Sequence, residues 1–347
     1  GLGANGDICD TINKALMGET VESFPDKALM PLDGKRVQST LQHYAYLRVA
    51  DGCDNCCTYC AIPLIRGHFR SRKMENILLE AQTLVNNGVK ELNVIAQDTT
   101  RYGEDLYGNL MLPELLRELC KIEGLEWIRI LYCYPDRITD ELIQTIKTED
   151  KIVKYIDLPL QHCNGEVLKR MNRNGDKESL VALINKLRRE IPNITLRTTL
   201  IAGFPGETES QFEELSQFVS DMKFERLGCF AYSTEEDTKA ALFADQIDED
   251  VRARRAQIIN EQQAIIIENS CQKYIGTTLD VLVDGYDRYA ECYFGRSMLD
   301  APEVDPCVFF STNGIKPKAG DIVKVRITDY LDCDLTGEME VQNESAK

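Results

Sequence analysis

Four cysteines lie within eight residues of this chain, and three of them have the spacing of ligands to one bound cluster. Cys53, Cys57 and Cys60 are separated by three and then two residues, so their thiols belong to one loop and can converge on one object. A closed zinc site and a fully ligated [4Fe–4S] cluster each take four protein ligands. Three cysteines instead leave one iron of a [4Fe–4S] cluster open to a cofactor. We predict that this loop holds such a cluster, with Cys56 as a bystander.

Two other chemistries remain as alternatives for this loop. A zinc site would need Cys56 or a distant cysteine as its fourth ligand, but no partner pair with Cys-x2-Cys or His-x3-His spacing exists elsewhere in the chain. A redox pair formed by Cys57 and Cys60 would leave Cys53 without a role. The chain has 13 cysteines, an odd number with four in one loop, which favours a reducing compartment over a disulfide framework. The cytoplasm is therefore the expected location.

The elements that position this loop follow a regular alternation of strands and helices. Six short apolar or β-branched segments, separated by segments of helical length, predict parallel strands with crossover helices. Six units indicate an α/β fold with an incomplete (β/α)6 TIM-like barrel, in which the loops after the strands share one rim. The predicted strands are 44–49, 91–96, 127–133, 155–160, 195–201 and 226–232, and the predicted helices are 72–87, 112–121, 139–147, 177–189 and 207–222.

Polar and aromatic residues near the predicted rim are candidates for cofactor contacts. Asp98 and Gln161 follow the second and fourth strands. Tyr59 lies inside the cysteine loop, where it could stack on an adenine ring or pack beneath the loop. The turn at 203–206 could serve a cofactor, or it could only begin a helix that Thr208 and Gln211 cap. The candidate cofactor-binding set is Tyr59, Gln97, Asp98, Gln161, Arg197 and Phe204.

Other polar residues near these motifs have simpler interpretations. His162 is interpreted as a structural histidine with satisfied hydrogen bonds, and not as a metal ligand. Arg66, Arg70 and Arg72 follow the cysteine loop closely, and their cations could balance an anionic cluster there. The alternative is that these arginines form a solvated surface. No residue is assigned as a catalytic acid, base or nucleophile.

The C-terminal part of the chain has a different pattern of apolar and polar residues. A long amphipathic helix is predicted at 248–272, with Val251, Ile258 and Ile265 at heptad spacing. Five short strands then predict a small all-β, OB-like barrel. Those strands are 278–283, 289–294, 307–311, 321–328 and 338–341. The expected division is a residual N-terminal segment or linker (1–40), the partial barrel (41–247), the connector helix (248–272) and the β module (273–347).

The motifs together resemble the radical S-adenosylmethionine (SAM) enzymes, and within them the methylthiotransferases. The resemblance rests on the cysteine loop and on five further segments, and the β module is similar to a TRAM domain. It implies that SAM binds the open iron and is cleaved to a 5′-deoxyadenosyl radical. The further segments are Gln97-Asp98-Thr99-Thr100, Leu158–His162, Met171-Asn172-Arg173, Gly203–Thr208 and Phe230–Ser233.

Charge separates the two branches of that family. The net charge of the chain is −17, and residues 273–347 carry 8 Lys and Arg against 14 Asp and Glu, a net charge of −6. A module that grips tRNA is expected to be basic, because phosphate contacts supply most non-specific affinity. The acidic module, with Gly295-Arg296 and the segment 300–305, resembles the module of the RimO type. That resemblance implies a small-subunit ribosomal protein as substrate, methylthiolated at the β-carbon of an aspartate. Nucleic acid is not the expected primary target.

The resemblance also implies further partners and leaves two alternatives. The implied electron donor is a protein such as flavodoxin, and no membrane is involved. The family has an N-terminal domain with a second [4Fe–4S] cluster, of which this sequence shows only a residual segment with Cys9. SAM cleavage without sulfur transfer is therefore expected of this chain. The alternatives are a MiaB-type tRNA adenosine methylthiotransferase and a non-catalytic, metal-stabilised adaptor that binds the ribosome.

Overall fold

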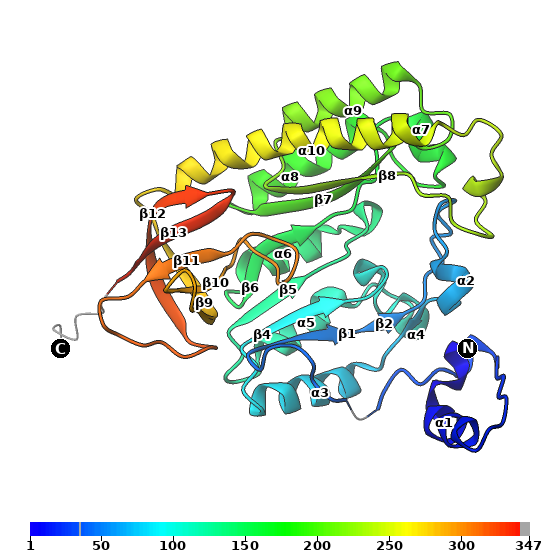
Figure 1. Ribbon diagram of the computed structural model, residues 1–347, viewed down its shortest axis with the longest axis horizontal. Coiled ribbons are helices and arrows are strands. Elements are labelled where there is room, and N and C mark those ends of the chain that lie inside the picture. Colours follow the sequence, from blue (N-terminus) through cyan, green and yellow to red (C-terminus); the bar gives the residue numbers. More distant parts are fainter. Residues whose placement is uncertain (35, 341–347) are drawn as a thin grey trace.

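A computed structural model describes residues 1–34 and 36–340 of the chain. It contains a curved sheet with helices on its outer face, one long helix that runs along the edge, and a small β barrel at the C-terminal end (Figure 1). None of the described helices is both long and apolar enough to cross a membrane.

The large sheet confirms the predicted incomplete barrel. Its six strands are all parallel and lie in the order β1-β4-β5-β6-β7-β8. Because β1 and β8 are its two edges, the sheet curves without closing. The strands are β1 (Tyr44–Arg48), β4 (Glu91–Ile95), β5 (Trp127–Ile130), β6 (Ile152–Asp157), β7 (Thr195–Ala202) and β8 (Arg226–Ala231).

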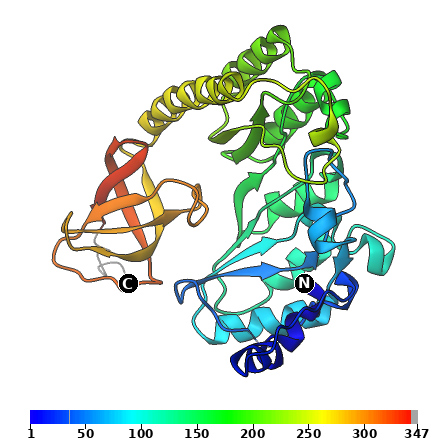
Figure 2. The same cartoon turned by 45° about the vertical axis from the view of Figure 1, so that its right-hand side comes forward.

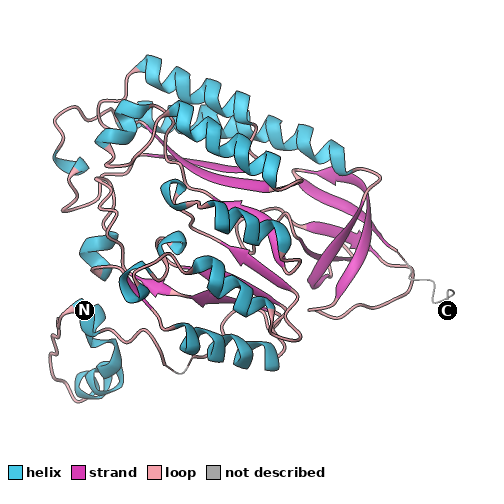
Figure 3. Ribbon diagram, turned by 180° about the vertical axis from the view of Figure 1, so that it is seen from behind, coloured by secondary structure: helices cyan, strands magenta, loops and turns pink. Residues whose placement is uncertain are grey.

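Crossover helices cover the outer face of this sheet, as the view from behind shows (Figure 3). Along β4, Leu92 and Val94 pack into the core beneath the helices, whereas the alternate residue Glu91 points to the inner face. Helix α9 begins with the predicted capping box, in which the Gln211 amide donates to Thr208 Oγ1 at 3.3 Å. The main helices are α3 (Met74–Asn86), α5 (Leu112–Cys120), α6 (Asp140–Thr148), α8 (Lys177–Glu190) and α9 (Glu209–Met222).

Short elements fill the connections. Most of them lie near the N-terminus or on the rim after the strands, where a longer element would obstruct the loops. They are η1 (Leu2–Asp7), α1 (Ile8–Leu16), η2 (Lys27–Leu29), β2 (Ala50–Asp51), α2 (Ile62–Arg66), β3 (Arg70–Ser71), η3 (Thr99–Arg101), α4 (Glu104–Tyr107), η4 (Pro135–Arg137), α7 (Gly165–Arg170), η5 (Ala240–Leu242) and η6 (Gln272–Tyr274).

The long helix α10 (Glu249–Cys271) is present as expected, but its buried face differs from the heptad stripe. Ala256 and Ile259 are buried, whereas Val251 is 40% exposed and Ile265 is 61% exposed. Helix α10 packs against α9 and β8. Of the three heptad residues, Ile258 alone packs against the main core cluster. A helix that lies on a mixed surface follows its own 3.6-residue period, so the 3.5-residue seam is not the face that it buries.

The β module forms the closed five-stranded barrel that was predicted, in the order β10-β11-β13-β12-β9. Two strands are displaced from their predicted positions, since β10 begins three residues later and β13 begins at Asp334. The predicted last strand also included Val341, which lies outside the described residues. The strands are β9 (Thr278–Asp287), β10 (Cys292–Ser297), β11 (Val308–Ser311), β12 (Ile322–Leu331) and β13 (Asp334–Met339).

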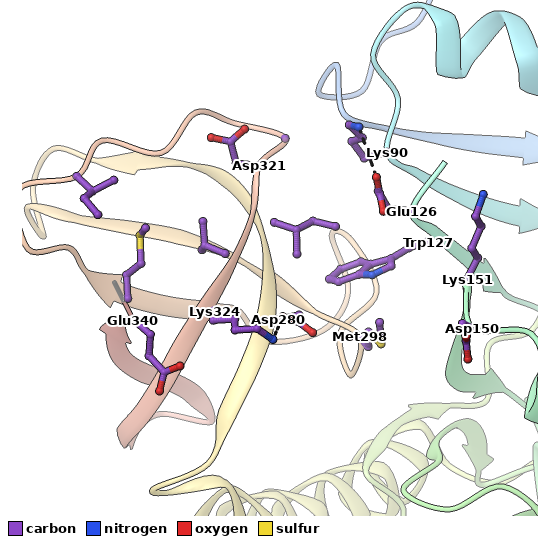
Figure 4. Close-up of a pocket in the computed structure, with 15 residues that line it drawn as sticks. Lys90, Glu126, Trp127, Asp150, Lys151, Asp280, Met298, Asp321, Lys324 and Glu340 are labelled. Atoms are coloured by element: carbon purple, nitrogen blue, oxygen red, sulfur yellow. Dashed lines mark hydrogen bonds and ion pairs between the residues drawn. The ribbon is translucent and has the colours of Figure 1, made fainter. Parts of the chain in front are cut away.

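This module packs against the inner face of the curved sheet, so that it lies opposite the crossover helices (Figure 2). Trp127 and Tyr155 of the sheet share one buried cluster with Leu282 and Ala301 of the module. Beside this cluster, a groove of about 1110 Å³ separates the first residues of β4, β5 and β6 from β9 and β12. Lysines and carboxylates of both parts line it (Figure 4).

Candidate functional site

The cysteine loop begins where two stretches of backbone touch. Gly52 has a φ of +79°, and a Cβ built on it would lie 2.0 Å from the carbonyl oxygen of His68. Only glycine tolerates both the left-handed backbone and this close approach. One residue later, the Cys53 amide donates to the Gly67 carbonyl at 3.2 Å. The backbone that carries Cys53, the first predicted ligand, is therefore fixed in place.

A second anchor comes from the residues that follow α7. The Thr58 amide donates to the Met171 carbonyl at 3.0 Å, and the Thr58 hydroxyl donates to the Arg170 carbonyl at 2.8 Å. Asn172, which has a positive φ of 58°, donates its side-chain amide to the Cys56 carbonyl at 3.1 Å. The cysteine loop is therefore held on two sides by backbone and side-chain hydrogen bonds that do not involve its thiols.

The three predicted ligands line one cavity of about 500 Å³ at the carboxyl end of the parallel strands. The loops after β1, β4, β5 and β6 contribute to it, together with inner-face residues at the ends of strands. Its lining comprises Arg48, Cys53, Asn55, Cys57, Tyr59, Cys60, Ile62, Ile95, Ala96, Gln97, Tyr132, Cys133, Tyr134, Asp157, Pro159, Gln161, Arg173, Arg197 and Thr199. Cys56 is exposed and is not part of this lining.

The donor set of this cavity fits an iron–sulfur cluster. Within residues 1–34 and 36–340, no three His, Cys, Asp or Glu side chains converge tightly enough to hold a single metal ion. A cubane cluster does not need such convergence, because each thiolate binds a different iron. The side-chain oxygen of Gln97, which also lines the cavity, is buried without a hydrogen-bond partner. An unpaired acceptor is costly to bury, so the cavity is chemically suited to a polar ligand beside the cysteines.

Burial shapes the acidity of the thiols. It raises the pKa of Cys53 to about 11, and it also raises the pKa of Cys60. A thiol must lose its proton before it binds a metal, so iron binding competes with this effect and releases protons.

One buried arginine supplies positive charge directly beside the cysteines. Arg173 Nη1 lies 3.9 Å from Cys57 Sγ and 3.4 Å from the Tyr59 hydroxyl, and Nη2 donates to the Pro159 carbonyl at 2.6 Å. Its guanidinium carbon also lies 4.2 Å from the ring centroid of Tyr134, a cation–π contact. Since it makes no ion pair with a described carboxylate, the charge of Arg173 is available to whatever the cysteines bind.

Four of the six predicted cofactor-binding residues line the cavity, namely Tyr59, Gln97, Gln161 and Arg197. Asp98 does not line it: its carboxylate accepts from Asn55 Nδ2 at 2.9 Å and pairs with Arg137 at 2.9 Å. That arrangement supports the cysteine loop from behind. The position of Asp98 therefore gives it a supporting role, and direct contact with the cofactor is not supported.

Phe204 also lies outside the cavity lining. It is fully buried, with its ring edge-on to Tyr232 and Phe243 in a cluster that Tyr59 packs against. The turn at 203–206 thus supports the cysteine loop through packing. A backbone pattern of Gly, Phe and Pro does not reveal whether its aromatic ring faces a ligand or the core.

The three arginines after the cysteine loop turn away from the cavity. Arg66 pairs with Asp51 at 3.1 Å, and Arg72 pairs with Asp33 at 2.6 Å. Arg70 donates to the Ala28 carbonyl at 2.6 Å. They therefore bind the N-terminal segment and the base of the loop, and their predicted role of balancing the cluster charge is not supported. The cations that line the cavity are Arg48, Arg173 and Arg197.

His162 is fully buried behind the rim. Its Nδ1 accepts from the Asn164 amide at 3.0 Å, and its Nε2 lies 3.4 Å from a Glu207 carboxylate oxygen. The buried position agrees with a structural histidine, but only Nδ1 is satisfied, because Nε2 has no hydrogen-bond partner among the described residues.

Sequence reasoning missed Arg48, Tyr132 and Arg173. Tyr132 follows β5, which ends at Ile130, whereas the predicted strand 127–133 included it and so concealed its place on the rim. It is 48% exposed and has a φ of 60°, a conformation that bulky residues rarely adopt. Gln161, also in the lining, has a φ of 71°. Strained backbone of this kind concentrates at functional sites.

Comparison with known proteins gives two kinds of match. The model of the radical SAM superfamily matches residues 47–219, and the model of the TRAM domain matches residues 275–339. The chain is 49% identical over 340 residues to the ribosomal protein uS12 methylthiotransferase RimO of Thermoanaerobacter sp. (strain X514), covering 97% of this chain and 77% of that protein. RimO of Clostridium botulinum (strain Hall) is 50% identical over 315 residues, covering 91% and 70%. RimO of Lachnoclostridium phytofermentans is 49% identical over 335 residues, covering 96% and 76%.

Proposed function

The chain belongs to the RimO family of methylthiotransferases within the radical SAM superfamily, and we propose that it serves the addition of a methylthio group to an aspartate of ribosomal protein uS12 by generating the radical for that reaction. The target atom in this proposal is the β-carbon of the aspartate. The observation that carries it is the cavity at the rim of the parallel sheet, where three half-buried cysteines of one loop meet polar residues from four strand ends.

The cluster would be a [4Fe–4S] cluster held by Cys53, Cys57 and Cys60, and SAM would occupy the rest of the cavity. When bound, the reduced cluster and SAM supply a 5′-deoxyadenosyl radical, which removes a hydrogen atom from the substrate. The protein's contribution is to bind, orient and exclude water. The anchors at Gly52 and Met171 fix the loop that carries the ligands.

Three cavity side chains have distinct parts in this proposal. Arg173 balances the negative charge of the thiolates, because it lies beside Cys57 without a carboxylate partner. The free amide oxygen of Gln97 suits a donor group of the cofactor, such as an ammonium or a ribose hydroxyl. Tyr59 is packed at the base of the loop, where burial raises the pKa of its hydroxyl and keeps it protonated. It therefore orients Arg173 and does not act as a base.

Charge supports a protein substrate over tRNA. Residues 273–347 carry a net charge of −6, and a basic ribosomal protein is attracted to such a surface whereas a phosphate backbone is repelled. The proposal includes a flavodoxin-like electron donor and a cytoplasmic location. The latter is supported by 13 cysteines that are all free thiols in the structure.

The test is an anaerobic reconstitution of the full chain with iron and sulfide, followed by incubation with SAM, reduced flavodoxin and either recombinant uS12 or tRNA. We expect four irons per chain and formation of 5′-deoxyadenosine without sulfur transfer; a methylthio group on one uS12 aspartate, detected by mass spectrometry, would show that this chain also carries out the sulfur step. Measuring 5′-deoxyadenosine separately from the modified aspartate distinguishes radical generation from sulfur transfer. Methylthiolation of tRNA in place of uS12 would favour the MiaB-type reaction, and one zinc per chain without SAM cleavage would favour an adaptor.

A further inference from the structure

One loop of the β module carries three carboxylates that reach into the curved sheet. Asp300 pairs with Arg226 at 2.5 Å, and Glu303 accepts from the Tyr44 hydroxyl at 2.9 Å. Neither Arg226 nor Tyr44 lines the cavity. Asp305 differs from both, because its Oδ1 lies 3.7 Å from Nε of Arg197, which does line the cavity.

Asp305 is itself fixed in position. Its Oδ2 accepts from the Tyr155 hydroxyl at 2.6 Å and from the Ala301 amide at 2.8 Å. The side chain is 3% exposed, so it has no freedom to turn toward solvent. Arg197 is therefore held from the module side by a carboxylate that cannot easily move.

On its other side, Arg197 reaches the cavity wall through Asp157. Arg197 Nη1 donates to Asp157 Oδ1 at 3.1 Å, and Asp157 Oδ2 accepts from the Tyr132 amide at 3.0 Å. Asp305, Arg197, Asp157 and Tyr132 thus form one continuous line of contacts. This line runs from the module to the mouth of the cavity.

Tyr132 needs such support. Its left-handed backbone, with a φ of 60°, is strained for a residue with a Cβ, and it persists only where neighbours determine it. The Asp157 carboxylate holds its amide, and its carbonyl accepts from the Thr99 amide at 3.0 Å. This conformation leaves the ring half-exposed at the cavity, the side from which a protein substrate must approach.

The same contacts indicate what Arg197 does not do. A guanidinium that lies between two carboxylates has its charge compensated, and it offers little attraction to a further anion. This contrasts with Arg173, which has no carboxylate partner among the described residues. Arg197 is better suited to carry a mechanical constraint than to bind the carboxylate of a cofactor.

We propose that Asp305 is a positioning residue of the β module: through Arg197 and Asp157 it holds Tyr132 at the mouth of the cavity, where the Tyr132 ring contacts the peptide segment that carries the target aspartate. The inference rests on the proposed function for the identity of that substrate. The line of contacts itself does not depend on it. In this view the module supports the wall of the active site from outside, in addition to any part in recruiting the substrate.

The first experiment compares Asp305→Asn with Glu303→Gln by hydrogen exchange of the full chain without cofactors. Both variants neutralise one carboxylate of the same loop, but only Asp305 lies on the line to Tyr132. We expect the Tyr132 amide to exchange roughly tenfold faster in Asp305→Asn and at the wild-type rate in Glu303→Gln, with the core amides of β7 unchanged in both. Equal protection of Tyr132 in the two variants would overturn the proposal.

Two further variants keep the test decisive. If Asp305→Asn does not fold, Arg197→Gln removes the next residue in the line of contacts. It should increase the exchange rate of the Tyr132 amide by a similar factor. Unchanged protection there would equally overturn the proposal. Tyr132→Asn removes the ring while asparagine tolerates the left-handed backbone. This variant should raise the KM for uS12 roughly tenfold without altering hydrogen exchange of the backbone amides elsewhere in the chain. An unchanged KM would overturn the proposed contact between Tyr132 and the substrate.

The outcomes separate this inference from the proposed function. A wild-type protein whose SAM cleavage is stimulated by tRNA and not by uS12 would refute the proposed substrate, while hydrogen exchange would still decide whether the module supports Tyr132. Conversely, SAM cleavage stimulated by uS12, with no difference in exchange between Asp305→Asn and Glu303→Gln, would refute only the positioning role.

Discussion

The inner face of the curved sheet borders two polar regions that differ in how their charged groups are paired. At the carboxyl ends of its strands lies the cavity, with three half-buried thiols. Arg173 has no carboxylate partner there among the described residues, and the Gln97 amide oxygen has no hydrogen-bond donor. Nearer the beginning of β4 lies the buried contact with the β module. Charged groups there are paired with one another.

That contact is built around Glu91, which is completely buried. Its carboxylate accepts from Arg129 at 2.9 Å and from Arg296 of the module at 2.5 Å. Arg296 pairs in turn with Asp284 at 2.9 Å, and Asp284 contacts His43 at 2.6 Å. Buried charges that are matched in this way specify one orientation of the module, since any other would leave an ion unpaired.

The difference shows what each region is for. The charges of the module contact satisfy each other, so this region is complete within the chain. The cavity holds one cation, Arg173, without a carboxylate partner among the described residues, and one acceptor, the Gln97 amide oxygen, without a hydrogen bond, as a site for a charged cofactor requires. Mutations should therefore affect stability at one region and cofactor chemistry at the other.

The largest expected effect is loss of the cluster from the cavity side. Cys57→Ala should abolish the iron–sulfur cluster, because two thiolates cannot hold a cubane against loss in solution. Iron and sulfide analysis with visible absorbance after anaerobic reconstitution would measure this. Cys56→Ala is the matched control and should reconstitute like the wild type, since Cys56 does not line the cavity. A full cluster in Cys57→Ala would refute the ligand assignment.

The next effect concerns the module contact. Arg296→Met should destabilise the protein by about 3–5 kcal/mol, because it leaves Glu91 and Asp284 buried without one of their partners. Urea unfolding followed by circular dichroism would measure the change. Lys324→Met removes an exposed partner of Asp280 and should change stability little. Equal destabilisation by both variants would contradict the contrast drawn between buried and exposed pairs.

A smaller effect is expected when the cavity cation is removed. Arg173→Gln should lower the midpoint potential of the cluster by roughly 50 mV, because loss of about 1–2 kcal/mol of attraction disfavours the added electron. A redox titration followed by electron paramagnetic resonance would measure it. Arg66→Gln is the control, since Arg66 pairs with Asp51 outside the cavity lining. A potential that moves in neither variant would show that Arg173 does not act on the cluster.

The smallest effect is the response to mild acid. Burial opposes the charge of Glu91, but Arg296 and Arg129 outweigh it and lower its pKa, so its contribution to stability is lost only as the pH falls below about 4. Burial raises the pKa of Asp157 and of Asp305, so protonation of these two favours the folded state as the pH falls. We expect nearly constant urea midpoints between pH 7 and 5 and a decline below pH 4. A steep loss already at pH 6 would contradict this balance.

Much of the fold followed from local patterns in the sequence. Alternation of strand and helix segments predicted six parallel strands and the small barrel, because burial on one or both faces leaves a periodic trace in the chain. The spacing of the cysteines predicted one loop, and the end of each strand predicted the rim. Four of six candidate contacts then proved to line the cavity.

The rest depends on contacts between distant residues. Arg66 and Arg70 are near the cysteines in sequence, yet Arg173, which is 116 residues from Cys57, is the arginine that touches it. The support of Tyr132 requires a module residue that no local pattern connects to the rim. Likewise, the burial of Phe204 depends on what packs over the turn. Sequence spacing placed the three predicted ligands in one loop, but it did not show which residues surround them.

The anchors of the cysteine loop have a consequence for survival of the protein in air. Because Gly67 and Met171 hold the loop through its backbone, folding of this segment does not depend on metal binding, unlike that of a zinc finger. Oxygen that destroys the cluster should leave a folded chain with its thiols still gathered. Such a protein can be repaired by delivery of new iron and sulfide, without degradation and resynthesis.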